Sequence, residues 1–275
     1  MMYGIDVSKH QGVIDWGKVK TDFAILRVGF GRYASQKDPQ FERNYAGAKA
    51  VGISVGAYWY SYAKSAEEAR EEAKACLQVL QGKQFEFPIY FDIEDSTQGN
   101  LGKTVLTAMC EAFCDTLEKA GYFAGVYAST YWFTSKLDHA RLAGKYTIWL
   151  ADYRAGYNKT LKRDMHQYTS NGNVPGISGR VDRNTCTRDF PAIIKKAGLN
   201  GFGKADKPLA GENGAQAACY TREIGPATRG DLIKLIEAAD KLGLYTVGAL
   251  TIGPMTGGDD AAIQALATEL GLECK

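Results

Sequence analysis

The feature that most restricts the fold of this chain is an alternation of apolar, strand-like runs with helix-like stretches. Strands that alternate with helices predict a parallel sheet in an α/β protein, and eight strand candidates permit closure of that sheet into a TIM-like barrel. After the fifth candidate the connections shorten or lose the helical pattern, which favours an irregular barrel over a symmetric one. The candidates cover residues 3–8, 23–29, 54–61, 88–94, 123–129, 147–152, 165–169 and 180–183.

Two of the intervening stretches carry clear helix signals. The stretch 65–81 opens on a capping box, formed by Ser65 and Glu68. The stretch 104–120 repeats apolar residues at a spacing of four, which places them on one face of a helix. Both helices fit the crossovers that a parallel sheet requires. Weaker helix candidates are residues 16–21 and 40–50.

An acidic pair ends the fourth strand candidate. Residues 88–95 read Pro-Ile-Tyr-Phe-Asp-Ile-Glu-Asp, so Asp92 and Glu94 stand two positions apart. On a strand such residues point to the same side, with Cα atoms about 6.5 Å apart. Two neighbouring carboxyl groups cannot both ionise freely, so one pKa should rise and provide a proton donor beside an anion. Cleavage of a glycosidic bond needs such a pair, whereas in the simpler alternative both acids cap the strand and meet solvent.

Acidic residues also stand at the ends of two other strand candidates. Asp6 closes the first candidate and Asp182 the eighth. In barrels built from strand–helix units, the active site lies at the C-terminal ends of the strands. Three strands that carry carboxylates to one face are difficult to explain by solvation alone. Asp6, Asp92, Glu94 and Asp182 are therefore the candidate catalytic residues.

Aromatic residues gather near the ends of several strand candidates. Sugar rings present apolar C–H faces that stack on aromatic rings, so Tyr58, Tyr62, Tyr127 and Trp149 are candidate substrate-binding residues. Strands favour aromatic residues in any case, and about half of the aromatic residues should simply belong to the core. Tyr62 and Tyr127 are the better candidates for a groove.

Composition and motifs argue against several other functions. A net charge of +2 is too small to indicate nucleic-acid binding, and no apolar run approaches the roughly 20 residues of a membrane anchor. Six cysteines without a Cys-x-x-Cys pair, and three histidines, argue against a metal site. Gly29-Phe-Gly31 lacks the third glycine of a dinucleotide site, so no cofactor is expected.

Four segments have the order and spacing of a known family: residues 4–16 (GIDVSKHQGVIDW), 23–29 (FAILRVG), 91–94 (FDIE) and 166–184 (HQYTSNGNVPGISGRVDRN). They resemble glycoside hydrolase family 25, the lysozymes or N-acetylmuramidases common among phage endolysins and bacterial wall-degrading enzymes. The resemblance spans residues 1–198. It implies a (β/α)5(β)3 barrel that hydrolyses the β-1,4 bond from N-acetylmuramic acid to N-acetylglucosamine in peptidoglycan.

The resemblance also implies roles for individual residues. Glu94 matches the general acid/base of the family, and Asp92 matches the carboxylate two positions before it. His166 stands where the family usually carries a tryptophan. Asp6 and Asp182 match the acids that complete the floor of the site, while Gln167, Tyr62 and Tyr127 fall where the family lines its groove.

Two mechanisms, both with retention of configuration, are open to Glu94 and Asp92. Glu94 would protonate the glycosidic oxygen and later activate water. Asp92 would act as a nucleophile, or it would orient the 2-acetamido group of the substrate, whose carbonyl oxygen attacks the anomeric carbon. The Asp-x-Glu spacing favours the second route by analogy with other N-acetylhexosamine hydrolases. A chitinase-like hydrolase and a non-catalytic wall-binding protein are the alternative functions.

The chain beyond the barrel reads as a linker, residues 199–213, followed by a small module, residues 214–275. Residues 224–231 (IGPATRGD) and 252–259 (IGPMTGGD) repeat one pattern, and each runs into a helix-like stretch. The repeat predicts a βαβαβ arrangement in an α+β domain. Its place after a muramidase-like unit predicts cell-wall binding, and self-association is plausible because a core of roughly 60 residues is marginal alone.

The start of the sequence bears on where the protein acts. The first strand candidate begins at Tyr3 with no secretory signal before it, and the scattered cysteines indicate reduced thiols. These features predict a protein that stays in the host bacterial cytoplasm until another protein opens the membrane, and that then acts on the wall outside.

Overall fold

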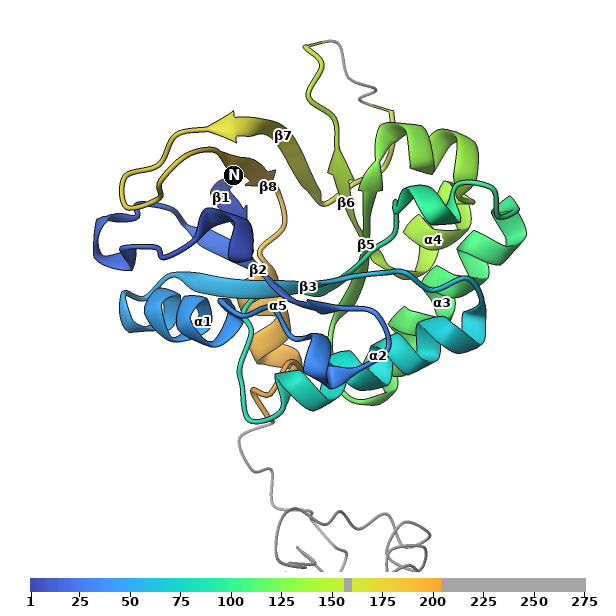
Figure 1. Cartoon of the computed structure of the whole chain (residues 1–275), viewed down its shortest axis with the longest axis horizontal. Coiled ribbons are helices and arrows are strands. Elements are labelled where there is room, and N and C mark those ends of the chain that lie inside the picture. Colours follow the sequence, from blue (N-terminus) through green and yellow to red (C-terminus); the bar gives the residue numbers. More distant parts are fainter. Residues whose placement is uncertain (156–159, 204–275) are drawn as a thin grey trace, which may run out of the picture. The chain divides into compact units, whose positions relative to one another are not determined.

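The structure is a computed structural model and describes residues 1–155 and 160–203. Its strands close into a barrel in which β1 to β8 follow one another around the ring in chain order (Figure 1). This confirms the predicted irregular α/β barrel. The strands are β1 Met2–Val7, β2 Phe23–Phe30, β3 Ser54–Tyr60, β4 Ile89–Asp92, β5 Ala124–Ser129, β6 Thr147–Ala151, β7 Met165–Gly172 and β8 Val181–Cys186.

Strand direction makes the barrel irregular. Every neighbouring pair from β1 to β7 is parallel. β8 runs antiparallel to both β7 and β1, so the expectation of a parallel sheet is wrong at this strand. The connection from Gly172 to Val181 is short, and a parallel return would need a crossover of about a dozen residues or more.

Helices cover the outside of the barrel (Figure 1). α2 begins as its capping box predicts, because the Ser65 hydroxyl accepts a hydrogen bond from the Glu68 amide at 3.2 Å. The weak candidate 16–21 forms only a 3-10 turn, Trp16–Lys18, and α4 and α5 were not predicted. No helix of the described residues is long and apolar enough to cross a membrane. The helices are α1 Phe41–Ala50, α2 Ala66–Leu80, α3 Lys103–Lys119, α4 His139–Lys145 and α5 Phe190–Ala197.

α5 closes the end of the barrel at which the parallel strands begin. Asp189 caps its first turn, and Phe190, the first residue of the helix, is fully buried. The Phe190 ring lies 5.7 Å from that of Phe87, which stacks on Phe23 at 4.3 Å. Since aromatic rings fill this end, the opposite end, where the parallel strands finish, is left for polar side chains.

The packed part of the chain extends past the predicted domain boundary. Asn200 is buried, and its side chain accepts a hydrogen bond from the Phe123 amide at 2.6 Å and donates to two backbone carbonyl groups at 3.1 and 2.9 Å. These bonds tie the start of the predicted linker to the barrel. Residues 204–213 of the linker and the predicted module 214–275, with its repeat, wall binding and self-association, lie outside the described residues.

Candidate active site

Four carboxyl groups meet at the end of the barrel opposite α5. Asp6 lies in β1, Asp92 is the last residue of β4, and Glu94 lies two residues beyond Asp92. Asp182 lies near the start of β8 rather than at its end, but it reaches the same face because this strand is reversed. Antiparallel pairing places it beside Asp6, and the charges of Asp6 and Glu94 both act on Asp92. The structure thus brings the four predicted acids together.

Asp6 is buried in a network of amides. Its Oδ2 accepts hydrogen bonds from Gln167 Nε2 and Asn184 Nδ2, both at 2.8 Å. Burial, and then the charge of Asp182, raise the pKa of Asp6 from 3.8 to about 8, although the two amides lower it. Burial also raises the pKa of Asp182. Because like charges this close cannot both form freely, at least one of the two carboxyl groups holds a proton near neutral pH.

Asp92 is a second buried acid, with 6% of its surface exposed. Burial raises its pKa well above the usual range, and the charges of Glu94 and Asp6 act in the same direction. Arg27 lowers this pKa, but its Nε is already paired with Asp38 Oδ2 at 2.6 Å. Among the described residues, Oδ1 of Asp92 has no hydrogen-bond partner. This oxygen is itself buried, and an unpaired buried acceptor further disfavours the ionised form of Asp92.

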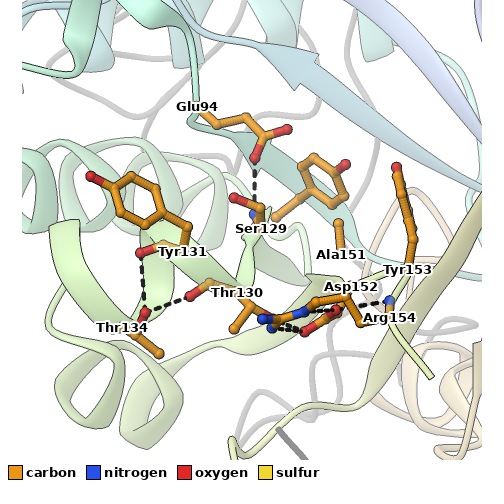
Figure 2. Close-up of a pocket in the computed structure, with 10 residues that line it drawn as sticks. Glu94, Ser129, Thr130, Tyr131, Thr134, Ala151, Asp152, Tyr153 and Arg154 are labelled. Carbon is orange, nitrogen blue, oxygen red and sulfur yellow. Dashed lines mark hydrogen bonds and ion pairs between the residues drawn. The ribbon is translucent and has the colours of Figure 1, made fainter. Parts of the chain in front are cut away.

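Glu94 lies in the wall of a pocket with a volume of about 570 Å³. Figure 2 shows its carboxyl group directed at Ser129, whose backbone amide donates to Oε2 at 2.9 Å. Burial raises the pKa of Glu94, and the hydrogen bonds from Ser129 lower it. A carboxyl group with a raised pKa beside an open pocket can give up a proton to a bound molecule and take one back.

Gln167 connects the pocket to the acids. Its Oε1 accepts hydrogen bonds from the hydroxyl groups of Tyr127 at 2.9 Å and Tyr153 at 2.7 Å, while its Nε2 donates to Asp6. Both tyrosines line the pocket with Glu94. The predicted groove residues Gln167 and Tyr127 thus belong to one hydrogen-bonded unit that fixes the position of Asp6.

Comparison with known proteins identifies the family of this chain. The family model for glycosyl hydrolases family 25 matches residues 5–177. This chain belongs to that family. The uncharacterised protein YegX of Escherichia coli O157:H7 is 30% identical over 197 residues, which are 66% of this chain and 68% of YegX.

Solved structures agree with the assignment. A bacterial lysozyme from Streptomyces coelicolor is 26% identical with a TM-score of 0.62, and the match covers 74% of this chain and 98% of that one. The modular autolysin LytC from Streptococcus pneumoniae, solved with a synthetic peptidoglycan ligand, is 26% identical with a TM-score of 0.59. That match covers 66% of this chain and 46% of LytC, so the chain spans about half of LytC. Family membership confirms the predicted enzyme class, glycoside hydrolase.

The four aromatic residues predicted to bind substrate take different places in this family 25 hydrolase. Tyr127 lines the pocket, and Tyr58 is partly buried near the charges of the acids. Tyr62 is 46% exposed but does not line the pocket. Trp149 is only 1% exposed, so the prediction of substrate contact is wrong for it. Its ring fills the barrel, and its Nε1 donates to Asn184 Oδ1 at 2.8 Å, which supports the amide that binds Asp6.

Several residues of the family 25 site were not predicted. Tyr153 follows β6 and could have been chosen as another strand-end aromatic residue. Arg27 is a charged residue inside an apolar strand, which was a usable signal of a buried ion pair. Asp152 and Arg154 carried no signal, because their bidentate pairing at 2.8 and 2.6 Å in the pocket wall depends on a loop conformation.

Two further predictions concern histidine and metal binding. His166, at the position where tryptophan was expected, is 8% exposed, and its Nε2 lies 2.8 Å from the Asp152 carbonyl oxygen. The histidine is thus a packed residue behind the pocket. Within residues 1–155 and 160–203, no group of three or more His, Cys, Asp or Glu side chains is arranged to hold a metal ion.

Proposed function

We propose that this protein is a lysozyme that hydrolyses the β-1,4 bond between N-acetylmuramic acid and N-acetylglucosamine in bacterial peptidoglycan. The observation that carries the proposal is the pair at the end of β4: Glu94 in the pocket wall with a raised pKa, and Asp92 buried two positions before it. The lysozyme among the structural relatives, and the peptidoglycan ligand in the LytC complex, support the choice of substrate.

In this proposal Glu94 is the general acid and then the general base. Burial raises its pKa, which keeps more of the protonated form near neutral pH and so favours proton donation to the glycosidic oxygen. After the leaving sugar departs, the same carboxylate removes a proton from the water that attacks the anomeric carbon. The Ser129 amide holds the carboxylate in place through both steps.

Asp92, the last residue of β4, would assist. Its Oδ1 is buried and has no partner among the described residues; a small side-chain rotation that turns this oxygen toward the pocket would let it accept a hydrogen bond from the N–H of the 2-acetamido group of the substrate. This bond would direct the acetamido carbonyl oxygen at the anomeric carbon. The alternative, direct attack by Asp92, needs its ionised form, which burial makes less favourable. Both routes retain configuration at the anomeric carbon.

The proposal is tested by Glu94→Gln, which keeps the size of the side chain and removes its proton chemistry. We expect wall lysis to fall by about a thousandfold or more, with no loss of thermal stability. Lysis is followed as turbidity of purified walls, and mass analysis of the products identifies the sugar at each new reducing end. Glu118→Gln, at an exposed position on α3, is the matched control.

Three outcomes would contradict the proposal. Substantial lysis by Glu94→Gln would refute the acid/base role. N-acetylglucosamine at the new reducing ends would indicate a different specificity. Wild-type protein that binds walls but releases no fragments would indicate a non-catalytic wall binder.

A further inference from the structure

Three polar side chains behind the active site are completely buried. Ser61 follows β3, Glu72 lies in the middle of α2, and Gln98 follows β4; each is 0% exposed. The chemistry proposed for Glu94 and Asp92 uses none of them. Burial of polar groups is unfavourable unless hydrogen bonds compensate for it, so the partners of these three residues indicate what the cluster does.

Glu72 holds the backbone of Tyr62. Its Oε1 accepts a hydrogen bond from the Tyr62 amide at 2.8 Å. Among the described residues, no lysine or arginine forms an ion pair with this carboxyl group; the nearby ion pairs use other glutamates of α2. Burial raises the pKa of Glu72 to about 7, although hydrogen bonds from Ser61 and from the amides of Tyr62 and Ala63 lower it. A carboxyl group in this setting contributes little to stability, but it fixes the segment that follows β3.

Gln98 joins this segment to the one that carries Glu94. Its Nε2 donates to the Ser61 hydroxyl at 3.1 Å and to the Ala63 carbonyl oxygen at 2.8 Å. Its Oε1 accepts from the amide of Asp95 at 3.2 Å, and Asp95 is the residue next to Glu94. A single buried amide therefore holds both segments.

Ser61 completes the connection on the side of Asp92. Its amide donates to the backbone carbonyl oxygen of Asp92 at 3.0 Å, and its hydroxyl accepts from the Ala63 amide at 3.1 Å. Outside the cluster, the Tyr60 hydroxyl donates to Asp95 Oδ2 at 2.9 Å. The end of β3 and the end of β4 are thus tied by both backbone and side-chain bonds.

We propose that Glu72 and Gln98 are positioning residues for the reaction: they lock the segment after β3 to the segment after β4, so that Asp92 and Glu94 keep a fixed geometry. This inference rests on the proposed function. Small displacements of a reacting group lower the rate far more than they lower binding. The locked strand ends would therefore matter for kcat more than for KM.

The test compares Glu72→Gln, Glu72→Ala and Gln98→Ala in the full chain, on soluble peptidoglycan fragments, at a temperature where every variant is folded. Glutamine at position 72 keeps an oxygen that accepts from the Tyr62 amide, so its kcat should stay within about twofold of wild type. The two alanine variants should lose about tenfold or more in kcat, with a much smaller change in KM.

Glu86→Ala is the matched control, because Glu86 supports the other end of β3. It is also buried, at 6% exposed, and its Oε2 accepts a hydrogen bond from the Val55 amide at 3.0 Å. Lys49 pairs with its other oxygen at 2.5 Å. This variant should lose thermal stability at least as much as Glu72→Ala does, while its folded molecules keep the wild-type kcat.

The outcomes separate a positioning role from a purely structural one. Unchanged kcat in Gln98→Ala and in folded Glu72→Ala would overturn the inference, as would equal losses in Glu72→Gln and Glu72→Ala. If Glu72→Ala does not fold, Gln98→Ala and Glu72→Gln decide the question. An inactive wild type would overturn the proposed function and the inference together, whereas an active wild type with unaffected variants would overturn the inference alone.

Discussion

The two ends of the barrel interior are filled with opposite kinds of side chain. At the end closed by α5, Phe23, Phe87 and Phe190 are fully buried; Phe23 stacks on Phe87, and Phe190 contacts Phe87 edge to face. At the other end Asp6 and Asp92 are also nearly buried, at 6% exposed each. Phe23 begins β2, Phe87 precedes β4 and Phe190 begins α5, whereas the two acids lie in β1 and at the end of β4.

Burial therefore has opposite consequences at the two ends. Apolar surface removed from water stabilises a fold by about 25 cal/mol per Å², whereas a buried carboxyl group resists ionisation and its pKa rises. Packing around α5 thus offsets the unfavourable burial of the acids. Substitutions at the acidic end should change activity and leave stability unchanged or improved, and substitutions at the aromatic end should do the reverse.

The largest effect that would sharpen this contrast is expected from Asp92→Asn. Loss of the carboxylate removes either the nucleophile or the group that orients the acetamido group, so the rate should fall about a thousandfold, or about 4 kcal/mol in the barrier. Stability should not fall, because the native pKa of Asp92 is raised by burial. Release of reducing ends and the thermal midpoint are the two measurements. A loss of activity below about tenfold would exclude both roles.

The acidic end was largely predictable from the sequence, and the reasons are local. The side-chain period of a strand, which is two, pointed to Asp92 and Glu94 as a pair, although β4 ends at Asp92 and Glu94 lies two residues beyond it. The barrel rule then placed the strand ends together. α5 was missed although its signals were present, since Asp189 and Gly198 occupy typical positions for a helix start and end.

Other parts of the site depend on contacts between distant residues. The bond from Gln167 to Asp6 joins positions 161 apart in the chain. The direction of β8 follows from a hairpin that no periodicity reveals. Trp149 was misassigned because an aromatic residue on a strand has the same pattern whether it fills the barrel or lines a groove; its place among rings at 4.4 to 6.2 Å decides that it is core.

Phe190→Ala tests the contrast between the two ends of the barrel at its aromatic end. Removal of this ring opens a cavity between α5 and the barrel, which should lower the free energy of unfolding by about 3 kcal/mol and the thermal midpoint by about 10 °C. The specific activity of the folded protein should be unchanged. Val105→Ala, at a 41% exposed position on α3, is the control and should change stability by less than about 0.5 kcal/mol. Equal losses in both variants, or a drop in kcat for Phe190→Ala at low temperature, would break the proposed separation of the two ends.

An effect of opposite sign, a gain in stability, is expected from Asp6→Asn. The native pKa of Asp6 is raised from 3.8 to about 8, so the folded protein holds this proton more tightly than the unfolded chain. Below about pH 4 both forms are protonated and the group contributes nothing. As the pH rises from about 4 to about 8, the unfolded chain ionises first, and the wild type loses stability. Asparagine does not titrate, and its oxygen can still accept from Gln167 and Asn184. The variant should therefore be equal in stability to wild type near pH 4 and more stable than wild type at pH 8, with a difference that grows as the pH rises.

Asp38→Asn is the control, because it should lower the stability of the protein where Asp6→Asn should raise it. Asp38 is equally buried, at 1% exposed, but it accepts from Arg27 Nε at 2.6 Å. Removal of its charge leaves the buried guanidinium group of Arg27 without an ionic partner, so this variant should be less stable than wild type at neutral pH. Thermal midpoints of both variants across pH 4 to 8 make the comparison. If Asp6→Asn also loses stability at pH 8, then Asp6 is held as a favourable carboxylate by its two amides. The acidic end would then contribute to folding in the same way as the aromatic end.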